Sequence, residues 1–156
     1  MKTLVVYYSR SGNNKKIADE LASSFPKADL ERIVPEKDYH GMMGWLKAGY
    51  SAPKFKRVKI NASRNPLDYN LVIFGGPLWA WGNLNNPLLS YLSNYKFKKT
   101  AFFSVSGSGN ISQAMKQLQE LGINPIATLA LSDRELRENA YKSKITDFCS
   151  SLKKIK

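Results

Sequence analysis

The segment Val5-Val6-Tyr7-Tyr8-Ser9-Arg10-Ser11-Gly12-Asn13-Asn14-Lys15-Lys16-Ile17-Ala18 decides the fold class. It begins within a β-branched and aromatic run, residues 3–9, that is typical of a buried strand. It continues into residues 13–25, where Ile17, Leu21 and Phe25 recur at every fourth position, as on one face of a helix. A strand, a tight loop and a helix are therefore expected in direct succession.

The same alternation continues to the end of the chain. Further strands are expected at residues 28–34, 70–76, 101–105 and 126–131. Helices are expected at residues 39–50, after a cap at Asn86, at 111–121 before Gly122, and finally after a Ser132–Glu135 capping box. The final helix is expected to place its apolar residues along one face, namely Tyr141, Ile145, Phe148, Cys149 and Leu152, which form an apolar stripe. Strands that alternate with helices predict an α/β fold: a five-stranded parallel sheet with helices on both faces.

Length and composition limit the other possibilities. At 156 residues and 43% apolar content, the chain is expected to form one globular domain, residues 1–156. Its single cysteine, Cys149, excludes a disulfide framework and a cysteine zinc site, and no metal site is expected. No apolar run reaches the length of a membrane span, and the N-terminal run is too short for a signal peptide. We expect a cytoplasmic protein.

The net charge of +12 is concentrated in one part of the chain. Residues 39–119 contain ten lysines and arginines and one acid, Asp68. An excess of this kind favours an acidic protein partner or an anionic ligand. A nucleic-acid-binding protein is a less favoured interpretation, because the basic residues are scattered and no nucleic-acid-binding module is present.

In a parallel α/β sheet the ligand lies at the carboxyl ends of the strands, so three loops are the candidate site. The first loop, residues 9–14, combines small polar side chains and a glycine at a helix N-terminus, which suits a phosphate. An ordinary helix cap explains the same residues equally well. The motifs of a nucleotide P-loop and of a dinucleotide fold are both missing here.

The second loop, residues 77–86, contains Trp79 and Trp81, and the third loop, residues 104–110, is rich in serine and glycine. Aromatic rings near a strand end suit stacking on a planar ligand, although either tryptophan could instead pack beneath the next helix. Serines and glycines let the backbone approach a ligand and supply hydrogen-bond donors, although a plain turn has the same composition.

Taken together, the three loops resemble those of the flavodoxin-like family over nearly the whole chain. The resemblance implies the strand order 2-1-3-4-5, a bound FMN and redox chemistry on its ring, with no catalytic side chain. It implies that the first loop holds the phosphate, that Trp79 stacks on the flavin, and that the third loop lines the pyrimidine edge. The implied FMN contacts are Ser9, Arg10, Ser11, Gly12, Asn13, Asn14, Pro77, Leu78, Trp79, Ala80, Trp81, Ser104, Ser106, Gly107, Ser108 and Gly109.

Three departures from the family pattern affect this expectation. Asn14 stands where the family usually has threonine, which removes a hydroxyl and keeps a donor. The third loop has no aromatic residue, so either Trp81 covers the second face of the flavin or that face is open to a substrate. Ala80 follows the stacking tryptophan where a residue tolerant of positive φ is usual, so Gly82 would have to take that conformation.

The resemblance favours an FMN protein that transfers electrons between protein partners. The alternative is an NAD(P)H-dependent reductase of a quinone or another small acceptor, with Arg10, His40 and residues 54–59 as candidate contacts for an anionic cosubstrate. A flavin-free interaction domain is a third interpretation. We expect lysines such as Lys54, Lys56 or Lys96 to make the second one-electron reduction easier than in an acidic flavodoxin.

Overall fold

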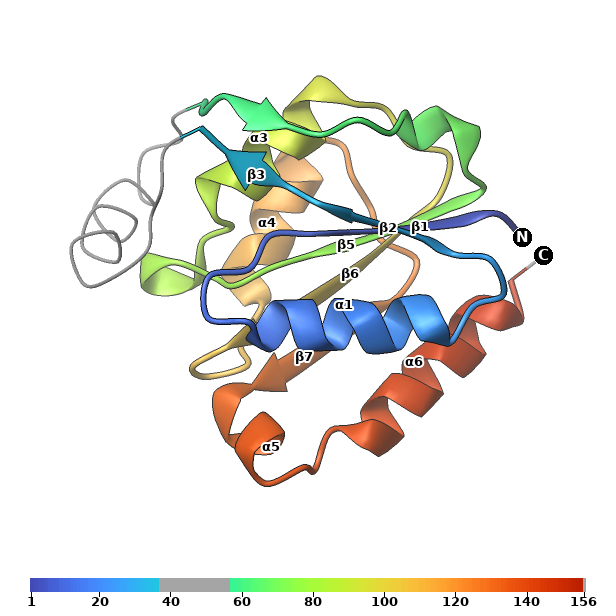
Figure 1. Ribbon diagram of the computed structural model, residues 1–156. Coiled ribbons are helices and arrows are strands. Elements are labelled where there is room, and N and C mark those ends of the chain that lie inside the picture. Colours follow the sequence, from blue (N-terminus) through green and yellow to red (C-terminus); the bar gives the residue numbers. More distant parts are fainter. Residues whose placement is uncertain (37–56, 156) are drawn as a thin grey trace.

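The computed structural model describes residues 1–36 and 57–155 (Figure 1). Its main sheet has the order β2-β1-β5-β6-β7, and every neighbouring pair of strands is parallel. These strands are β1 (Thr3–Tyr7), β2 (Asp29–Arg32), β5 (Leu71–Gly75), β6 (Thr100–Ser106) and β7 (Thr128–Ser132). Renumbered along this sheet alone, the order is 2-1-3-4-5, which confirms the predicted fold class.

Helices cover both faces of the sheet (Figure 1). α1 (Asn13–Ser23) and α6 (Lys142–Lys153) pack on one face, and α3 (Asn86–Asn94) and α4 (Ser112–Glu120) on the other. Successive residues of β1 alternate between the two cores, with Val5 in the core of α1 and α6 and Val6 in the core of α3 and α4. Both faces of the strand are buried, which explains why it reads as a continuous apolar run.

A separate two-stranded antiparallel sheet was not predicted. It pairs β3 (Val34–Pro35) with β4 (Ile60–Asn61), and the 3₁₀ helix η1 (Pro66–Asp68) follows. The predicted helix at residues 39–50 lies outside the described residues, as do His40, Lys54 and Lys56.

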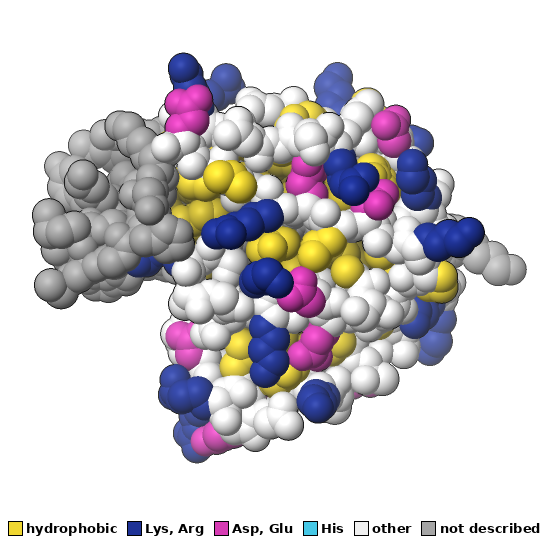
Figure 2. Space-filling model, viewed as in Figure 1, with side chains coloured by type: hydrophobic (Ala, Val, Ile, Leu, Met, Phe, Trp, Pro, Cys, Tyr) yellow, Lys and Arg dark blue, Asp and Glu magenta, His cyan; other side chains and the backbone are white. Residues whose placement is uncertain are grey.

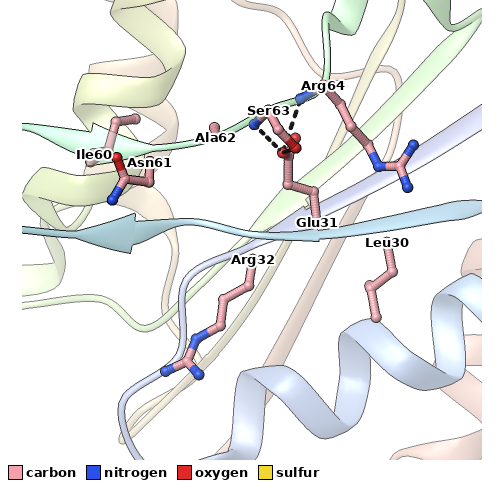
Figure 3. Close-up of a pocket in the computed structure, with 8 residues that line it drawn as sticks. All are labelled: Leu30, Glu31, Arg32, Ile60, Asn61, Ala62, Ser63 and Arg64. Atoms are coloured by element: carbon pink, nitrogen blue, oxygen red, sulfur yellow. Dashed lines mark hydrogen bonds between the residues drawn. The ribbon is translucent and has the colours of Figure 1, made fainter.

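Glu31 of β2 binds the segment that follows β4, at Ser63 and Arg64. One carboxylate oxygen, Oε1, accepts hydrogen bonds from the Ser63 amide (2.5 Å), the Ser63 hydroxyl (3.1 Å) and the Arg64 amide (3.0 Å). The side chain is only 7% exposed. Figure 3 shows these bonds at the side of a hollow of about 570 Å³ between β2 and residues 60–64, where Arg32 and Arg64 point away from each other. Glu31 is therefore a structural anchor of the sheet edge.

Replacing Glu31 with alanine is expected to lower the free energy of unfolding by roughly 1–3 kcal/mol, because three hydrogen bonds to a buried carboxylate are lost. Urea denaturation monitored by circular dichroism measures the change. The exposed Glu36, just beyond β3, provides the control, since its replacement by alanine should change stability by less than about 0.5 kcal/mol. Equal losses in the two variants would contradict the anchoring role.

The predicted final helix is in fact two helices, α5 (Asp133–Arg137) and α6. The capping box of Ser132 and Glu135 is confirmed, but it begins the short α5. Asn139 has a φ of 55°, and the Ala140 amide donates to the Glu135 carbonyl at 2.9 Å, which closes a Schellman-type end. The predicted apolar stripe is nevertheless correct, because all five of its residues are buried.

Two other local predictions were wrong. α3 is capped by Asn85 instead of Asn86, since the Asn85 side chain accepts a hydrogen bond from the Leu88 amide at 2.8 Å. The helix predicted at residues 111–121 is α4, which begins at Ser112 and ends at Glu120, so Leu121 is an exposed C-cap residue. Gly122, with a φ of 73°, follows α4 as predicted.

Both chain termini lie at the amino edge of the sheet, opposite the carboxyl ends of the strands (Figure 1). Met1, Asn70, Lys98, Lys99 and Ile155 line one hollow there. Among the described residues, no helix combines the length and apolar content that crossing a membrane requires.

Candidate functional site

The three candidate loops lie together at the carboxyl edge of the sheet. They follow β1, β5 and β6, which are adjacent in the sheet order. In Figure 1 they occupy the left side of the sheet, away from both termini. The residues predicted from separate parts of the sequence are thus brought to one place.

The first loop presents the N-terminus of α1, whose own first turn contains no acidic residue. Gly12 is the N-cap, with a φ of 95°, and α1 has neither a side-chain cap nor an acidic residue in its first turn. The Gly12 amide donates to the buried Ser9 hydroxyl at 3.2 Å, and Ser11 and Gly12 are exposed. The first amides of a helix have no intrahelical partner and attract anions, so this loop suits a phosphate.

Two lysines in the first turns of α1 add positive charge near this loop. Lys15 forms an ion pair with Asp19 at 2.7 Å, and the hydrogen bond to Asp19 raises the pKa of Lys15. A hydrogen bond to Tyr141 raises the pKa of Lys16. Both side chains therefore stay protonated at neutral pH. Cations are unfavourable at a helix N-terminus, and a bound anion would compensate for them.

Asn14 connects the first loop to the third. Its side-chain Nδ2 donates to the Val105 carbonyl at 3.0 Å, and its Oδ1 accepts from the Val105 amide at 2.9 Å. The side chain is 3% exposed. Both of its polar atoms are thus engaged within the protein, although the sequence suggested a donor for the phosphate.

The second loop separates its two tryptophans. Trp79 is 8% exposed and belongs to the core that contains Leu84 and Leu88, whereas Trp81 is 77% exposed. The open expectation that one tryptophan packs beneath the next helix is met by Trp79. Its predicted contact with a flavin stays a prediction, and Trp81 is the ring that the loop offers to a ligand.

A tight turn holds Trp81 in this position. The Trp79 amide donates to the Asn83 carbonyl at 2.8 Å, across the 3₁₀ turn η2 (Ala80–Gly82). Trp81 has a φ of 58° and Gly82 a φ of 76°. As anticipated, Gly82 and not Ala80 takes a positive φ. The loop is also fastened to α4, because the Leu84 amide donates to Gln117 Oε1 at 2.7 Å.

The third loop is organised by its own hydroxyl groups. Ser106 Oγ accepts from the Gly109 amide at 3.2 Å, and Ser108 Oγ accepts from the Asn110 amide at 3.2 Å. The buried Ser104 donates to the Gly76 carbonyl at 2.8 Å, which ties the third loop to the start of the second. Gly107 and Ser108 are exposed at the tip. The tip is therefore a polar surface, supported by a fixed base.

Sequence reasoning missed three residues that support these loops. Asp133, directly after β7, accepts a hydrogen bond from the Asn13 side chain at 3.1 Å. Gln113 and Gln117 of α4 both contact the second loop, through Asn83 Oδ1 (3.4 Å) and the Leu84 amide. Their spacing of four residues places both glutamines on one helix face, which was the available signal.

Among the described residues, Figure 2 shows lysine and arginine side chains scattered between acidic ones on the face that it presents. Lys96 lies between α3 and β6 and therefore at the amino edge of the sheet, opposite the candidate loops. Arg64 is bound to Asp29 (3.3 Å) and Tyr69 (3.2 Å) beside the start of β2. Residues 75–95 and 100–115, which include the second and third loops, contain no acidic and no basic residue.

Comparison with known proteins places the chain in a family. A family model described as flavodoxin matches residues 2–147. The chain belongs to the flavodoxin family. This confirms the predicted resemblance. No curated protein sequence matches the chain significantly.

Solved structures agree with this assignment. A putative flavoprotein from Bacteroides uniformis is 27% identical, with a TM-score of 0.69 over 90% of this chain and 97% of that one. One from Bacteroides eggerthii is 20% identical, with a TM-score of 0.72 over 94% and 97%. A flavoprotein from Lactobacillus acidophilus, solved in complex with FMN, is 24% identical, with a TM-score of 0.65 over 88% and 97%. The last two likenesses show the shared fold.

The described residues fit FMN, the cofactor expected of a flavodoxin. The first loop offers a positive helix end without a competing carboxylate in the first turn, and Gly12 leaves open space, since a Cβ there would meet nothing within 4 Å. The second and third loops offer an exposed ring and polar groups without charge. The phosphate and the flat ring of FMN require these two environments side by side.

Proposed function

We propose that this protein binds FMN and transfers electrons between protein partners. The observation that carries the proposal is the arrangement of the first loop: a helix N-terminus with no side-chain cap and no first-turn acid, beside two uncharged loops. In this proposal the first loop binds the phosphate through its backbone amides. Bound FMN would accept and donate electrons, and the protein would position it at the surface.

Trp81 is the ring that we propose to stack on the flavin. It is the exposed aromatic residue of the second loop, and its turn is fixed by backbone hydrogen bonds and by α4. A loop whose backbone is already held in place loses little freedom when it binds a ligand. Trp79 would then support the loop from within the core.

The charge of the second and third loops bears on the reduction potential of a bound flavin. We expect the second one-electron reduction to be easier than in acidic flavodoxins, because the second and third loops contain no carboxylate that would repel negative charge on the reduced ring. Lysines at the amino edge, such as Lys96, lie at the opposite end of the sheet and should contribute less. A redox titration that found a very low second potential would contradict this expectation.

The alternative function is an NAD(P)H-dependent reductase of a quinone or a similar small acceptor. It is favoured by the third loop, which has no aromatic residue and therefore leaves one ring face uncovered by that loop. A planar acceptor could approach that face. The proposed partners are accordingly an acidic redox protein or an anionic cosubstrate. A cytoplasmic location stays a prediction.

A visible spectrum of the purified protein, followed by an FMN titration of the flavin-free form, tests the proposal. Flavin absorbance and stoichiometric FMN uptake are expected. Rapid bleaching by NAD(P)H under anaerobic conditions would support the reductase, whereas bleaching only with a reduced protein donor would support the carrier. A protein that takes up no FMN would contradict both.

A further inference from the structure

At the carboxyl edge of the sheet, β6 extends beyond the end of its neighbour β5. The pairing of β5 with β6 ends at Gly75 and Phe103, while β6 continues to Ser106. In a parallel strand, the amide and carbonyl of one residue point to the same side. The Lys99 carbonyl accepts from Val72 of β5, and the Phe102 amide donates to Ala127 beside β7. By this alternation, residues 99, 101, 103 and 105 face β5.

Val105 therefore faces a position that β5 does not reach. An unpaired backbone amide and carbonyl in a buried place are unfavourable, so some other group has to bind them. The Asn14 side chain does so, with bonds of 2.9 and 3.0 Å to the amide and the carbonyl. An asparagine amide has one donor and one acceptor side, as a strand residue does, so Asn14 continues the sheet where β5 ends.

This bond pair joins two parts of the site that are distant in sequence. Asn14 belongs to the first turn of α1, at the proposed phosphate position, and Val105 belongs to the base of the third loop. The hydroxyl of Ser104, the residue before Val105, donates to the Gly76 carbonyl at the start of the second loop at 2.8 Å. Asn14 thus provides a direct side-chain link between the first loop and the third.

We propose that Asn14 is a positioning residue for the flavin ring and not a ligand of the phosphate. The inference rests on the proposed FMN function and assigns Asn14 a role at that site. By binding the backbone of Val105, Asn14 fixes the base of the third loop, and the tip of that loop lines the proposed ring position. The bonds to Val105 use one Nδ2 hydrogen and one Oδ1 lone pair, and they hold the side chain toward β6 in a place where it is only 3% exposed.

The variants Asn14→Ala and Asn14→Thr test this role against FMN and riboflavin, which lacks the phosphate. Dissociation constants for both ligands are expected to rise by about the same factor, on the order of tenfold, because two hydrogen bonds that fix the third loop are lost. Threonine should fail as alanine does, since one hydroxyl cannot occupy both sides of Val105. The midpoint potential of bound FMN should also shift.

Hydrogen exchange provides a readout that needs no flavin. In the flavin-free variants the Val105 amide is expected to exchange at least about tenfold faster, while the amides of Phe102 and Phe103 stay protected. Asn70→Ala is the control: the Asn70 side chain also binds a backbone amide, that of Lys2 at 2.8 Å, but at the opposite edge. This control should leave Val105 exchange and both affinities unchanged.

Two results would overturn the proposal. The first is a loss of FMN affinity with riboflavin affinity intact, or full retention of FMN affinity by Asn14→Thr, which would make Asn14 a phosphate ligand. The second is unchanged exchange at Val105. If the unaltered protein bound neither flavin, the proposed function would fail instead, and the exchange data would still show whether Asn14 holds Val105.

Discussion

Replacing Gly12 with aspartate is expected to weaken FMN binding at least about 100-fold and to leave riboflavin binding within about threefold. The new carboxylate would stand at the N-cap of α1, where we propose that the phosphate binds, and two anions cannot share one helix end. Riboflavin carries no phosphate and avoids the repulsion. Quenching of flavin fluorescence during titration measures both affinities.

The chain contains a matched control for this variant. Gly122 also has a positive φ, 73° against 95° at Gly12, and a Cβ at either position would meet nothing within 4 Å. Gly122 follows α4 at the opposite edge of the sheet. Gly122→Asp should therefore carry a similar backbone strain, on the order of 1–2 kcal/mol, without affecting either ligand. Equal weakening of FMN by both variants would show that strain, and not charge at the phosphate position, is responsible.

The two tryptophans of the second loop are expected to respond in opposite ways. Trp79→Ala should lower the free energy of unfolding by about 3–5 kcal/mol, because it empties a large space in the core beside Leu84 and Leu88. Trp81→Ala should change stability by less than about 0.5 kcal/mol, since the side chain is exposed. Trp81→Ala should instead weaken flavin binding about tenfold through lost stacking.

Denaturant unfolding and FMN titration of both variants distinguish these effects. Trp81→Phe, which keeps a ring for stacking, should recover most of the affinity that alanine loses. If Trp81→Ala bound FMN as tightly as the unaltered chain, the stacking role would be contradicted. A normal stability of Trp79→Ala would contradict the burial of that residue.

Much of the fold could be predicted because it depends on local patterns. The apolar spacing of Ile17, Leu21 and Phe25 specifies a helix wherever the segment lies, and Gly122 ends α4 through its own backbone conformation. The split between α5 and α6 was missed since it depends on Asn139, a residue that tolerates a positive φ but also occurs within helices.

The site was predicted as three loops, but the roles of single residues could not be assigned from the chain alone. Asn14 reads as a phosphate donor in its loop, and only the contact with Val105, 91 residues away, shows its side chain to be occupied. Lys96 falls in the same basic region as the second loop, yet it lies at the opposite edge because α3 carries the chain back across the sheet.

The sequence by itself determined the α/β class, the strand-loop-helix units and the family, since each rests on residues close together in the chain. Only the tertiary structure decided which tryptophan is buried, where the lysines lie and what Asn14 binds. The contact of Asn14 with Val105 follows from the order and unequal lengths of the strands. β5 ends at Gly75, whereas β6 continues to Ser106. The sequence of one strand does not show where its neighbour ends, so this difference could not be predicted from either strand.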